Sequence, residues 1–389
     1  MKKYTYLLTL FLAILATACI EEPNNEQANA VFEPYIQKFR TDAKRYGKNF
    51  DQTDLVMRFA DLTDNKAGQC YMHKRPILIE IDRTYWEIIS NSSNAENLRE
   101  ELIFHEMGHG FLQRLHLNDQ FALGDWQSMM FGDALPNNCE PALNYRGMRK
   151  EYYLKELFTQ TNEAPEWDIQ DAPDFTGVAE STAYELDASQ KQVSTSENQY
   201  YQASLGNGLW SIHNKTDERL LISFAENIRT DANFCIEMTF QIAGPSTGTY
   251  GGGLVWGNPY STEQPYNIHY CELNTNKHML LGEETCLLPF IDIYTQPLNP
   301  KEYNTLKIRK HGMYVYYFIN NQFVYYNDLT NLATGGNTFG ILLLGRTDFN
   351  VQSLVVKANS SSLLPTLRSQ STHTNKVVVL PKPLQRKEM

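Results

Sequence analysis

Hydrophobic positions follow two different rhythms along this chain. Between residues 31 and 160, several stretches have apolar side chains every three or four positions, which is the spacing of an amphipathic helix. From about residue 200, apolar residues gather in short, aromatic-rich runs separated by turn residues, a pattern typical of β-strands. The change of rhythm predicts an α+β domain followed by an all-β sandwich.

The first half combines helical and strand patterns, and Ser93 or Asn94 is the expected cap of its central helix. In the second predicted strand three isoleucines share one face, so this strand lies either in the core or at a sheet edge that pairs with an extended substrate. Helices are predicted over 31–47, from the cap at 93 or 94 through 105 to just beyond 109, and from about 149 through 157; strands are predicted over 55–60 and 76–82.

The second half carries strand patterns of regular length, and Asn320-Asn321 between two of them predicts a hairpin. Regular short strands of this kind predict a sandwich or jelly roll. Strands are predicted over 234–240, 254–256, 268–271, 305–309, 314–319 and 323–326. The domain limits that follow are an α+β domain over 31–163, a linker over 164–199, a sandwich over 200–357 and a disordered tail over 358–389.

The N-terminus has the pattern of an export signal. Two lysines precede an apolar run over 7–18, which is shorter than the roughly 20 residues that span a bilayer. Small residues then lead directly to Cys19, which resembles a bacterial lipoprotein signal over 1–19 with Cys19 as the acylated residue. The alternative is an ordinary secretory signal cut near Ala18. Either way we expect an exported protein, and with the lipid a cell-surface or outer-membrane one that is anchored by a tether over 20–30.

Composition limits the classes of protein and partner that fit this chain. A chain of 389 residues has room for two domains, and its 42% hydrophobic content is that of a globular protein. The net charge of -11 argues against a nucleic-acid partner, because phosphates require a basic face. Five cysteines remain if Cys19 is lipidated, an odd number, and the candidate bridges are Cys70–Cys139 and Cys271–Cys286.

His105, Glu106 and His109 form the pattern with the clearest chemistry. Positions four apart lie on the same face of a helix, so both imidazoles can reach one ion, and zinc takes imidazole nitrogen readily. Glu106 lies beside them and can act as the general base toward a zinc-bound water. The pattern predicts one zinc ion and hydrolytic chemistry, against the plainer alternative of two solvated histidines on a surface helix.

The predicted third ligand is His116. An unbroken helix would carry it about 16 Å beyond His105 along the axis, so the helix must end soon after His109 and the chain must fold back. Asp119, Asp125 and a remote glutamate are the competing ligands, since zinc also accepts carboxylate oxygen.

The zinc pattern also resembles a known family. Residues 105–116 read HEMGHGFLQRLH, followed by a Ser-x-Met sequence at 128–130 and a tyrosine-rich helix. These features resemble metzincin-like zinc peptidases, and more closely a group of exported bacterial metallopeptidases. Over about residues 31–160 the resemblance implies a twisted sheet over a long active-site helix, with Met130 in a turn beneath the metal. Two departures stand out: metzincins generally have a glycine where Leu112 stands, and their third histidine falls one residue before His116.

A tyrosine that donates to the developing oxyanion would suit this chemistry. Tyr145, Tyr152 and Tyr153 are the candidates, and nothing in the sequence chooses among them.

The second half resembles the concanavalin-like, laminin-G-like jelly rolls. This resemblance rests on stretches such as 234–240 and 250–257. The resemblance implies a glycan- or protein-binding domain. Glu237 and Glu272 are the carboxylates that a glycosidase would need. Sugar-stacking candidates are Trp256, Tyr266 and His269, although aromatic residues with a purely structural role are the commoner case.

The sequence therefore predicts an exported, lipid-anchored zinc metalloendopeptidase that acts on a protein or peptide and carries a lectin-like binding domain. The competing hypothesis is a glycan- or protein-binding surface lipoprotein whose peptidase half is a degenerate scaffold.

Overall fold

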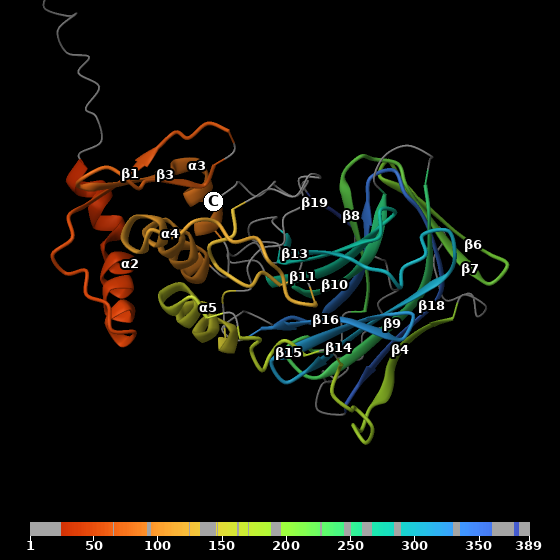
Figure 1. Ribbon diagram of the computed structural model, residues 1–389. Helices are drawn as coiled ribbons and strands as arrows, with labels where there is room; N and C mark the ends of the chain where they lie inside the picture. The colour runs from red at the N-terminus through yellow and green to blue at the C-terminus, as the bar shows by residue number, and fades with distance from the viewer. Residues whose placement is uncertain are drawn as a thin grey trace, which may run out of the picture.

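The protein has two parts, an α+β half and a β-sandwich, which lie side by side in the computed structural model (Figure 1). The structure describes residues 25–64, 66–91, 95–123, 125–132, 145, 147–161, 163–169, 171–187, 196–225, 228–244, 250–258, 267–283, 289–329, 335–359 and 377–380. Cys19, Cys139, Cys286 and the predicted signal over 1–19 lie outside these residues. Cys70 and Cys271 were the proposed disulfide partners of Cys139 and Cys286. Both are free thiols, as is Cys235.

The α+β half is built on a small mixed sheet. Its strand order is β1-β3-β2, with β1 parallel and β2 antiparallel to β3. Asp82 ends β3 and caps the next helix, since its Oδ1 accepts a hydrogen bond from the Tyr85 N–H at 2.7 Å. The elements are α2 (Asn25–Arg45), β1 (Leu55–Ala60), β2 (Gly68–Tyr71), β3 (Ile77–Asp82), α3 (Arg83–Ser90), α4 (Ala95–Leu112) and α5 (Gly147–Thr159).

Helix α4 runs through the middle of this half. It contacts α2, α3, β2 and β3, and Leu102, Ile103 and Phe104 are fully buried on it. A helix that is apolar on several sides needs neighbours on several sides, and this one has them. Residues 93 and 94, the expected cap, lie outside the described residues.

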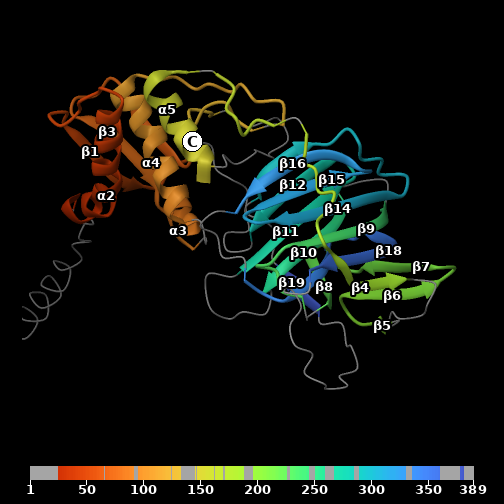
Figure 2. The same ribbon diagram turned by 90° about the horizontal axis from the view of Figure 1, so that it is seen from below.

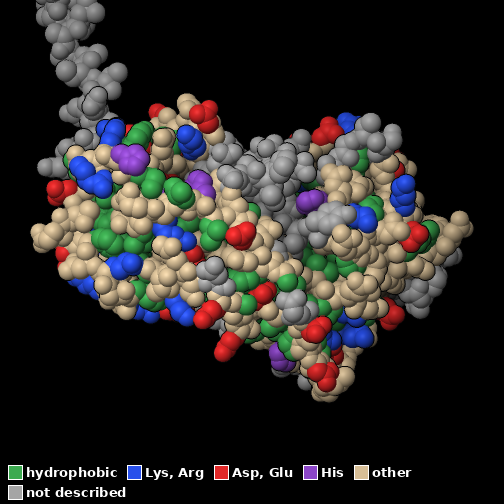
Figure 3. Space-filling view, in the orientation of Figure 1, with side chains coloured by type: hydrophobic (Ala, Val, Ile, Leu, Met, Phe, Trp, Pro, Cys, Tyr) green, Lys and Arg blue, Asp and Glu red, His purple; other side chains and the backbone are tan. Residues whose placement is uncertain are grey.

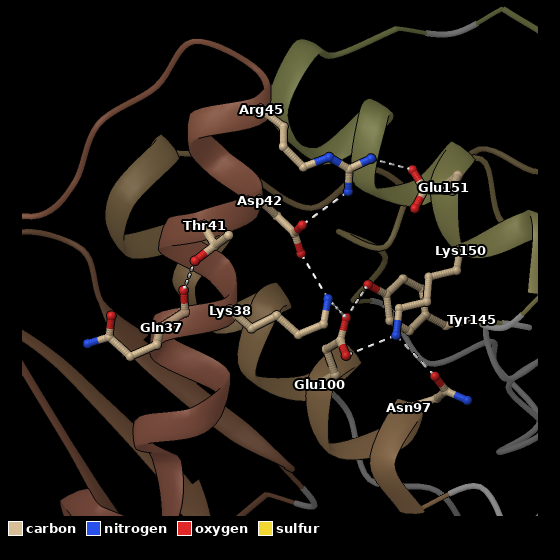
Figure 4. A network of polar contacts seen from close by, with 10 residues as sticks. All are labelled: Gln37, Lys38, Thr41, Asp42, Arg45, Asn97, Glu100, Tyr145, Lys150 and Glu151. Atoms are coloured by element: carbon tan, nitrogen blue, oxygen red, sulfur yellow. Dashed lines mark hydrogen bonds and ion pairs between the residues drawn. The ribbon is translucent and has the colours of Figure 1, made fainter.

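A polar network ties the first turns of α4 to both flanking helices (Figure 4). The buried carboxylate of Glu100 accepts from Lys38 of α2 at 3.1 Å and from Lys150 of α5 at 2.9 Å. The Tyr145 hydroxyl donates to it at 2.8 Å. A buried carboxylate is tolerated when such donors surround it, so this contact fixes α4 relative to α2 and α5.

The second part confirms the predicted sandwich. In the described residues it has a nine-stranded sheet along the path β16-β15-β14-β9-β18-β7-β6-β5, with β4 paired to β18, and a seven-stranded sheet of order β13-β12-β11-β10-β17-β8-β19. Figure 2 shows the two layers from below. From Ile236 to the end of β9 buried and half-buried side chains alternate, as expected when one face meets the opposite sheet. Asn320 and Asn321 both have positive φ, 51° and 63°, and make the predicted hairpin turn.

The strands of the sandwich are β4 (Ser181–Asp187), β5 (Ser196–Glu197), β6 (Tyr201–Gly206), β7 (Leu209–Asn214), β8 (Arg219–Ala225), β9 (Phe234–Ala243), β10 (Gly251–Asn258), β11 (Asn267–Asn274), β12 (His278–Glu283), β13 (Pro289–Tyr294), β14 (Asn304–His311), β15 (Tyr314–Ile319), β16 (Gln322–Asp328), β17 (Thr338–Leu344), β18 (Asp348–Ala358) and β19 (Val377–Leu380).

Three expected boundaries differ from the structure. Helix α2 begins at Asn25, inside the predicted tether, and β4 and β5 lie inside the predicted linker over 164–199. Strand β19 lies in the predicted tail and pairs with β8. Strands β4 and β19 pair with β18 and β8, which lie far away in the sequence, so no local pattern predicts these pairings.

The face shown in Figure 3 has lysine, arginine, aspartate and glutamate side chains interspersed over both halves. Among the helices of the described residues, none has the length and apolarity that crossing a membrane requires.

Candidate metal centre

Three histidine side chains converge at the end of α4. The Nε2 atom of His109 lies 3.1 Å from Nε2 of His105 and 3.1 Å from Nε2 of His116. The ligand atoms of all three lie within 4.8 Å of one another. Zinc–imidazole bonds of about 2.0–2.1 Å in a tetrahedron would separate ligand nitrogens by about 3.4 Å. The spacing of the three nitrogens therefore fits one shared ion.

Backbone carbonyls orient two of these rings. Nδ1 of His105 lies 2.7 Å from the Met129 carbonyl oxygen, and Nδ1 of His109 lies 2.6 Å from the Arg114 carbonyl oxygen. A carbonyl only accepts, so each Nδ1 carries a hydrogen, and in the neutral ring each Nε2 is then a bare lone pair. Two lone pairs that face each other at 3.1 Å repel unless a cation lies between them. These carbonyl contacts are also the partners that metal-bound histidines usually have.

The chain reverses directly after α4. Gln113 takes a positive φ of 55°, and the Arg114 N–H bonds the Gly108 carbonyl at 3.2 Å. This bend is the early helix end that the spacing required. It falls one residue after Leu112.

His116 occupies space that a side chain at residue 132 would fill. A Cβ on Gly132 would lie 2.2 Å from the His116 ring. Asp125, a competing ligand in the sequence, is instead bonded to Arg149 at 2.7 Å, and the residues brought together do not include Asp119. Of the ligands considered, the structure brings His116 to the other two histidines.

Met130 lies in a turn and packs against Gly108, which stands between His105 and His109 in the sequence of α4. Its sulfur packs so closely on α4 that a Cβ at Gly108 would meet it at 2.5 Å. The Ser128 hydroxyl oxygen accepts the Met130 N–H at 3.0 Å and donates to Glu156 of α5 at 2.7 Å. Arg114 donates to the same carboxylate at 2.5 Å. Glu156 therefore joins the bend after α4 to the turn below it, a role that sequence analysis missed.

Glu106 is buried beside the histidines. It is 1% exposed, and its Oε2 has no hydrogen-bond partner among the described residues. Burial raises the pKa of Glu106 to about 8. Its other oxygen faces β2, where a Cβ on Gly68 would lie 2.5 Å from Oε1. A buried carboxylate oxygen without a donor, next to three imidazoles, is the arrangement expected of a proton acceptor.

A cavity of about 360 Å³ opens over these residues. On one side it is bordered by β2, the edge strand of the small sheet. The hypothesis that the 76–82 strand forms this edge is wrong, because β3 pairs with β1 on one side and β2 on the other and is buried on both faces. The lining residues are Lys66, Gly68, Gln69, Cys70, Met72, Glu106, His109, Leu115, His116 and Gly132.

Two of the lining residues, Leu115 and Cys70, carry uncharged side chains. Leu115 is 73% exposed, which is unusual for a leucine and places an apolar side chain at the rim. Burial, and then the charge of Glu106, raises the pKa of the Cys70 thiol to about 12, so Cys70 is a neutral thiol.

The three tyrosines proposed for the oxyanion bond elsewhere. The hydroxyls of Tyr145, Tyr152 and Tyr153 donate to Glu100, the Gln127 carbonyl and the Trp126 carbonyl. None of them lines the cavity in the described part of the chain.

The sandwich candidates are also structural. Glu237 pairs with Lys307 on the nine-stranded sheet, whereas Glu272 is buried beside Arg219 on the seven-stranded one, so they do not face each other as a glycosidase pair. Trp256 is buried and stacks on His269 at 5.6 Å. Tyr266 lies outside the described residues.

Comparisons with known proteins show only distant likenesses. No protein-family model matches the chain, and no curated protein matches it. A Bacillus subtilis protein of unknown function with a galectin-like fold shares 10% identity over 45% of this chain and 94% of its own, at a TM-score of 0.34. The Emp47p carbohydrate recognition domain shares 14% over 48% of this chain and 98% of its own, also at 0.34.

A third structure, described with endo-acting O-glycanases of the human gut microbiota, shares 8% identity over 48% of this chain and 100% of its own, at 0.35. Likenesses at these identities and TM-scores have no bearing on what the chain does.

Proposed function

We propose that the chain is a zinc-dependent metallopeptidase in which His105, His109 and His116 hold one ion and Glu106 is the catalytic base. The observation that supports this most is the pair of Nε2 atoms, 3.1 Å apart, whose Nδ1 atoms both face carbonyl oxygens. A cation between them removes the repulsion that the bare nitrogens would otherwise feel.

A zinc ion held by these nitrogens would supply Lewis acidity to a substrate carbonyl and to an attacking water. The chain's own residues supply the rest of the chemistry. The free Oε2 of Glu106 accepts a proton from the water and returns it to the leaving amine. The buried surroundings of α4 keep bulk water away from that carboxylate and strengthen its interactions.

The cavity suits an extended chain. Among the described residues strand β2 pairs with β3 alone. We propose that the backbone groups on its other side bind a peptide that lies along it. Gly68 and Gln69 of this strand line the cavity together with Glu106. We therefore propose a protein or peptide substrate, cut between residues that lie across the three histidines.

Export and anchoring through Cys19 remain part of the proposal, on the strength of the N-terminal pattern alone. The sandwich would then bind a surface glycan or protein and hold the peptidase near its substrate.

The test compares Glu106→Gln with the parent and with Glu96→Gln, an exposed glutamate in the first turn of the same helix. Each protein is loaded with zinc, its metal content is measured, and its cleavage of casein is followed. We expect Glu106→Gln to keep one zinc and to cleave at least about 100-fold more slowly, whereas Glu96→Gln matches the parent. Equal cleavage by Glu106→Gln and the parent would overturn the assignment of the base.

The competing hypothesis, a binding lipoprotein with a degenerate scaffold, predicts a different result. The parent would then cleave neither casein nor gelatin while it retains its fold. Peptidoglycan fragments belong in the same panel, because hydrolysis of a non-peptide amide would use the same residues.

A further inference from the structure

Residues 117–123 and 125–130 form the two arms of a hairpin-like loop, called the 117–130 loop below. The Leu117 N–H bonds the Met130 carbonyl, the Gln127 N–H bonds the Asp119 carbonyl and the Phe121 N–H bonds the Asp125 carbonyl, each at 2.8 Å. Three backbone bonds at this spacing align the two arms of the loop from base to tip. These bonds connect the tip of the loop to its base.

The base of this loop touches the metal centre on both arms. His116 directly precedes Leu117 on the first arm. On the second arm, the Met129 carbonyl orients His105, and the Met130 sulfur packs on α4. The position of the loop thus sets two of the three imidazoles.

The tip of the loop reaches the sandwich. Leu123 packs against the hydrophobic core of the sandwich as well as that of the α+β half. Asp125, beside it, is 3% exposed and accepts a hydrogen bond from the Tyr325 hydroxyl of β16 at 2.6 Å. The same carboxylate is bonded to Arg149 of α5 at 2.7 Å.

Arg149 completes the contact between the two halves. Its guanidinium is fully buried and donates to the Tyr325 hydroxyl at 2.8 Å and to the Tyr326 carbonyl at 3.2 Å. It also lies over the Trp167 ring, 4.7 Å from the ring centre. Buried charges need such partners, so Asp125 is held where both Arg149 and Tyr325 can reach it.

An isolated two-stranded loop is marginally stable in water, so its shape depends on what holds its tip. We propose that the β-sandwich positions the metal ligands of the α+β half, with Tyr325 as the positioning residue that acts through Asp125 and the 117–130 loop. This inference rests on the metal site of the proposed function. In it, the sandwich completes the metal centre in addition to any binding role.

The test uses Tyr325→Phe in the full-length chain, which removes one hydroxyl and keeps the ring. The matched control is Tyr326→Phe, the next residue. It also donates across the interface, to the Trp167 carbonyl at 2.8 Å, but it does not touch Asp125 with its hydroxyl. Zinc affinity is measured by competition with a chelator. Amide hydrogen exchange of residues 117–130 is measured on the metal-free proteins.

We expect Tyr325→Phe to bind zinc about tenfold more weakly than the parent, at the low end of losses seen when groups behind metal ligands are removed. The Phe121 and Gln127 amides should exchange faster in this variant, while Tyr326→Phe matches the parent in both measurements. Unchanged zinc affinity and exchange in Tyr325→Phe would overturn the proposal, as would equal losses in both variants. If the parent binds no zinc, but residues 117–130 still exchange faster in Tyr325→Phe than in the parent, the metal site is overturned. The contact between the loop and the sandwich would then still be supported.

Discussion

The metal centre depends on small residues that leave space for neighbouring side chains, as well as on the residues that bind the ion. His116 stands where a side chain at Gly132 would otherwise be, and the Met130 sulfur fills the space above Gly108. These contacts join segments that are far apart in the sequence. Small residues at such points decide whether the ligands can meet.

Gly132→Ala should therefore weaken metal binding without unfolding the chain. The added Cβ would approach the His116 ring to 2.2 Å and push this exposed side chain outward. We expect zinc affinity to fall by about 10- to 100-fold, as for other changes that misplace a ligand, with little change in thermal unfolding. Gly206→Ala is the control, because nothing lies within 4 Å of its added Cβ. Parent-like zinc affinity in Gly132→Ala would argue against His116 as a ligand.

At this scale the sequence predicted the residues whose relation is local. His105 and His109 share a helix face by spacing alone, and the required bend suggested His116. The Met129 carbonyl, Gly132 and Glu156 could not be found in this way. Their role depends on which distant segments fold together, and carbonyls and glycines carry no sequence signal for such contacts.

Among the elements, helix α5 supports the site from behind. Its Glu156 accepts from Arg114, whose carbonyl orients His109, and from Ser128 in the turn that holds Met130. Glu156 is 2% exposed. A buried carboxylate with these two partners holds the end of α4 and the Ser128–Met130 turn in one arrangement.

Glu156→Gln should lower the stability of the metal-free protein. The Arg114 guanidinium would stay buried without its counter-charge, and breaking such a pair costs about 3–5 kcal/mol. Glu151→Gln on the same helix is the control, because Glu151 forms an exposed pair with Arg45, and such pairs contribute about 0–1 kcal/mol. Urea unfolding of both variants measures the difference. Similar midpoints for the two would contradict the role given to Glu156.

Elements with strong periodicity were predicted well from the sequence. Helices α2, α4 and α5 and strands β1 and β3 lie where the pattern placed them, with ends that differ by a few residues. Strand β2 was missed because its four residues, Gly68–Tyr71, carry no alternating pattern. For that reason the edge was assigned to β3, whose apolar face instead reflects its central position.

On the scale of the whole molecule, apolar side chains of the two halves pack against each other. Tyr316 and Tyr326 of the sandwich belong to the hydrophobic cluster of the α+β half, and Leu123 packs on both clusters. The sequence predicted two domains joined by a linker. It could not predict this contact, because buried aromatic residues at a domain interface have the same pattern as those in a strand core.

The central claim is that one zinc ion is held by three imidazoles of this chain. X-ray absorption of the zinc-loaded protein tests it most directly, because the spectrum reports the type and distance of the bound atoms. We predict one zinc per chain with three imidazole nitrogens at about 2.0–2.1 Å and no sulfur. A sulfur neighbour at about 2.3 Å, such as Cys70 in the same cavity, would contradict the account, as would the absence of stoichiometric zinc.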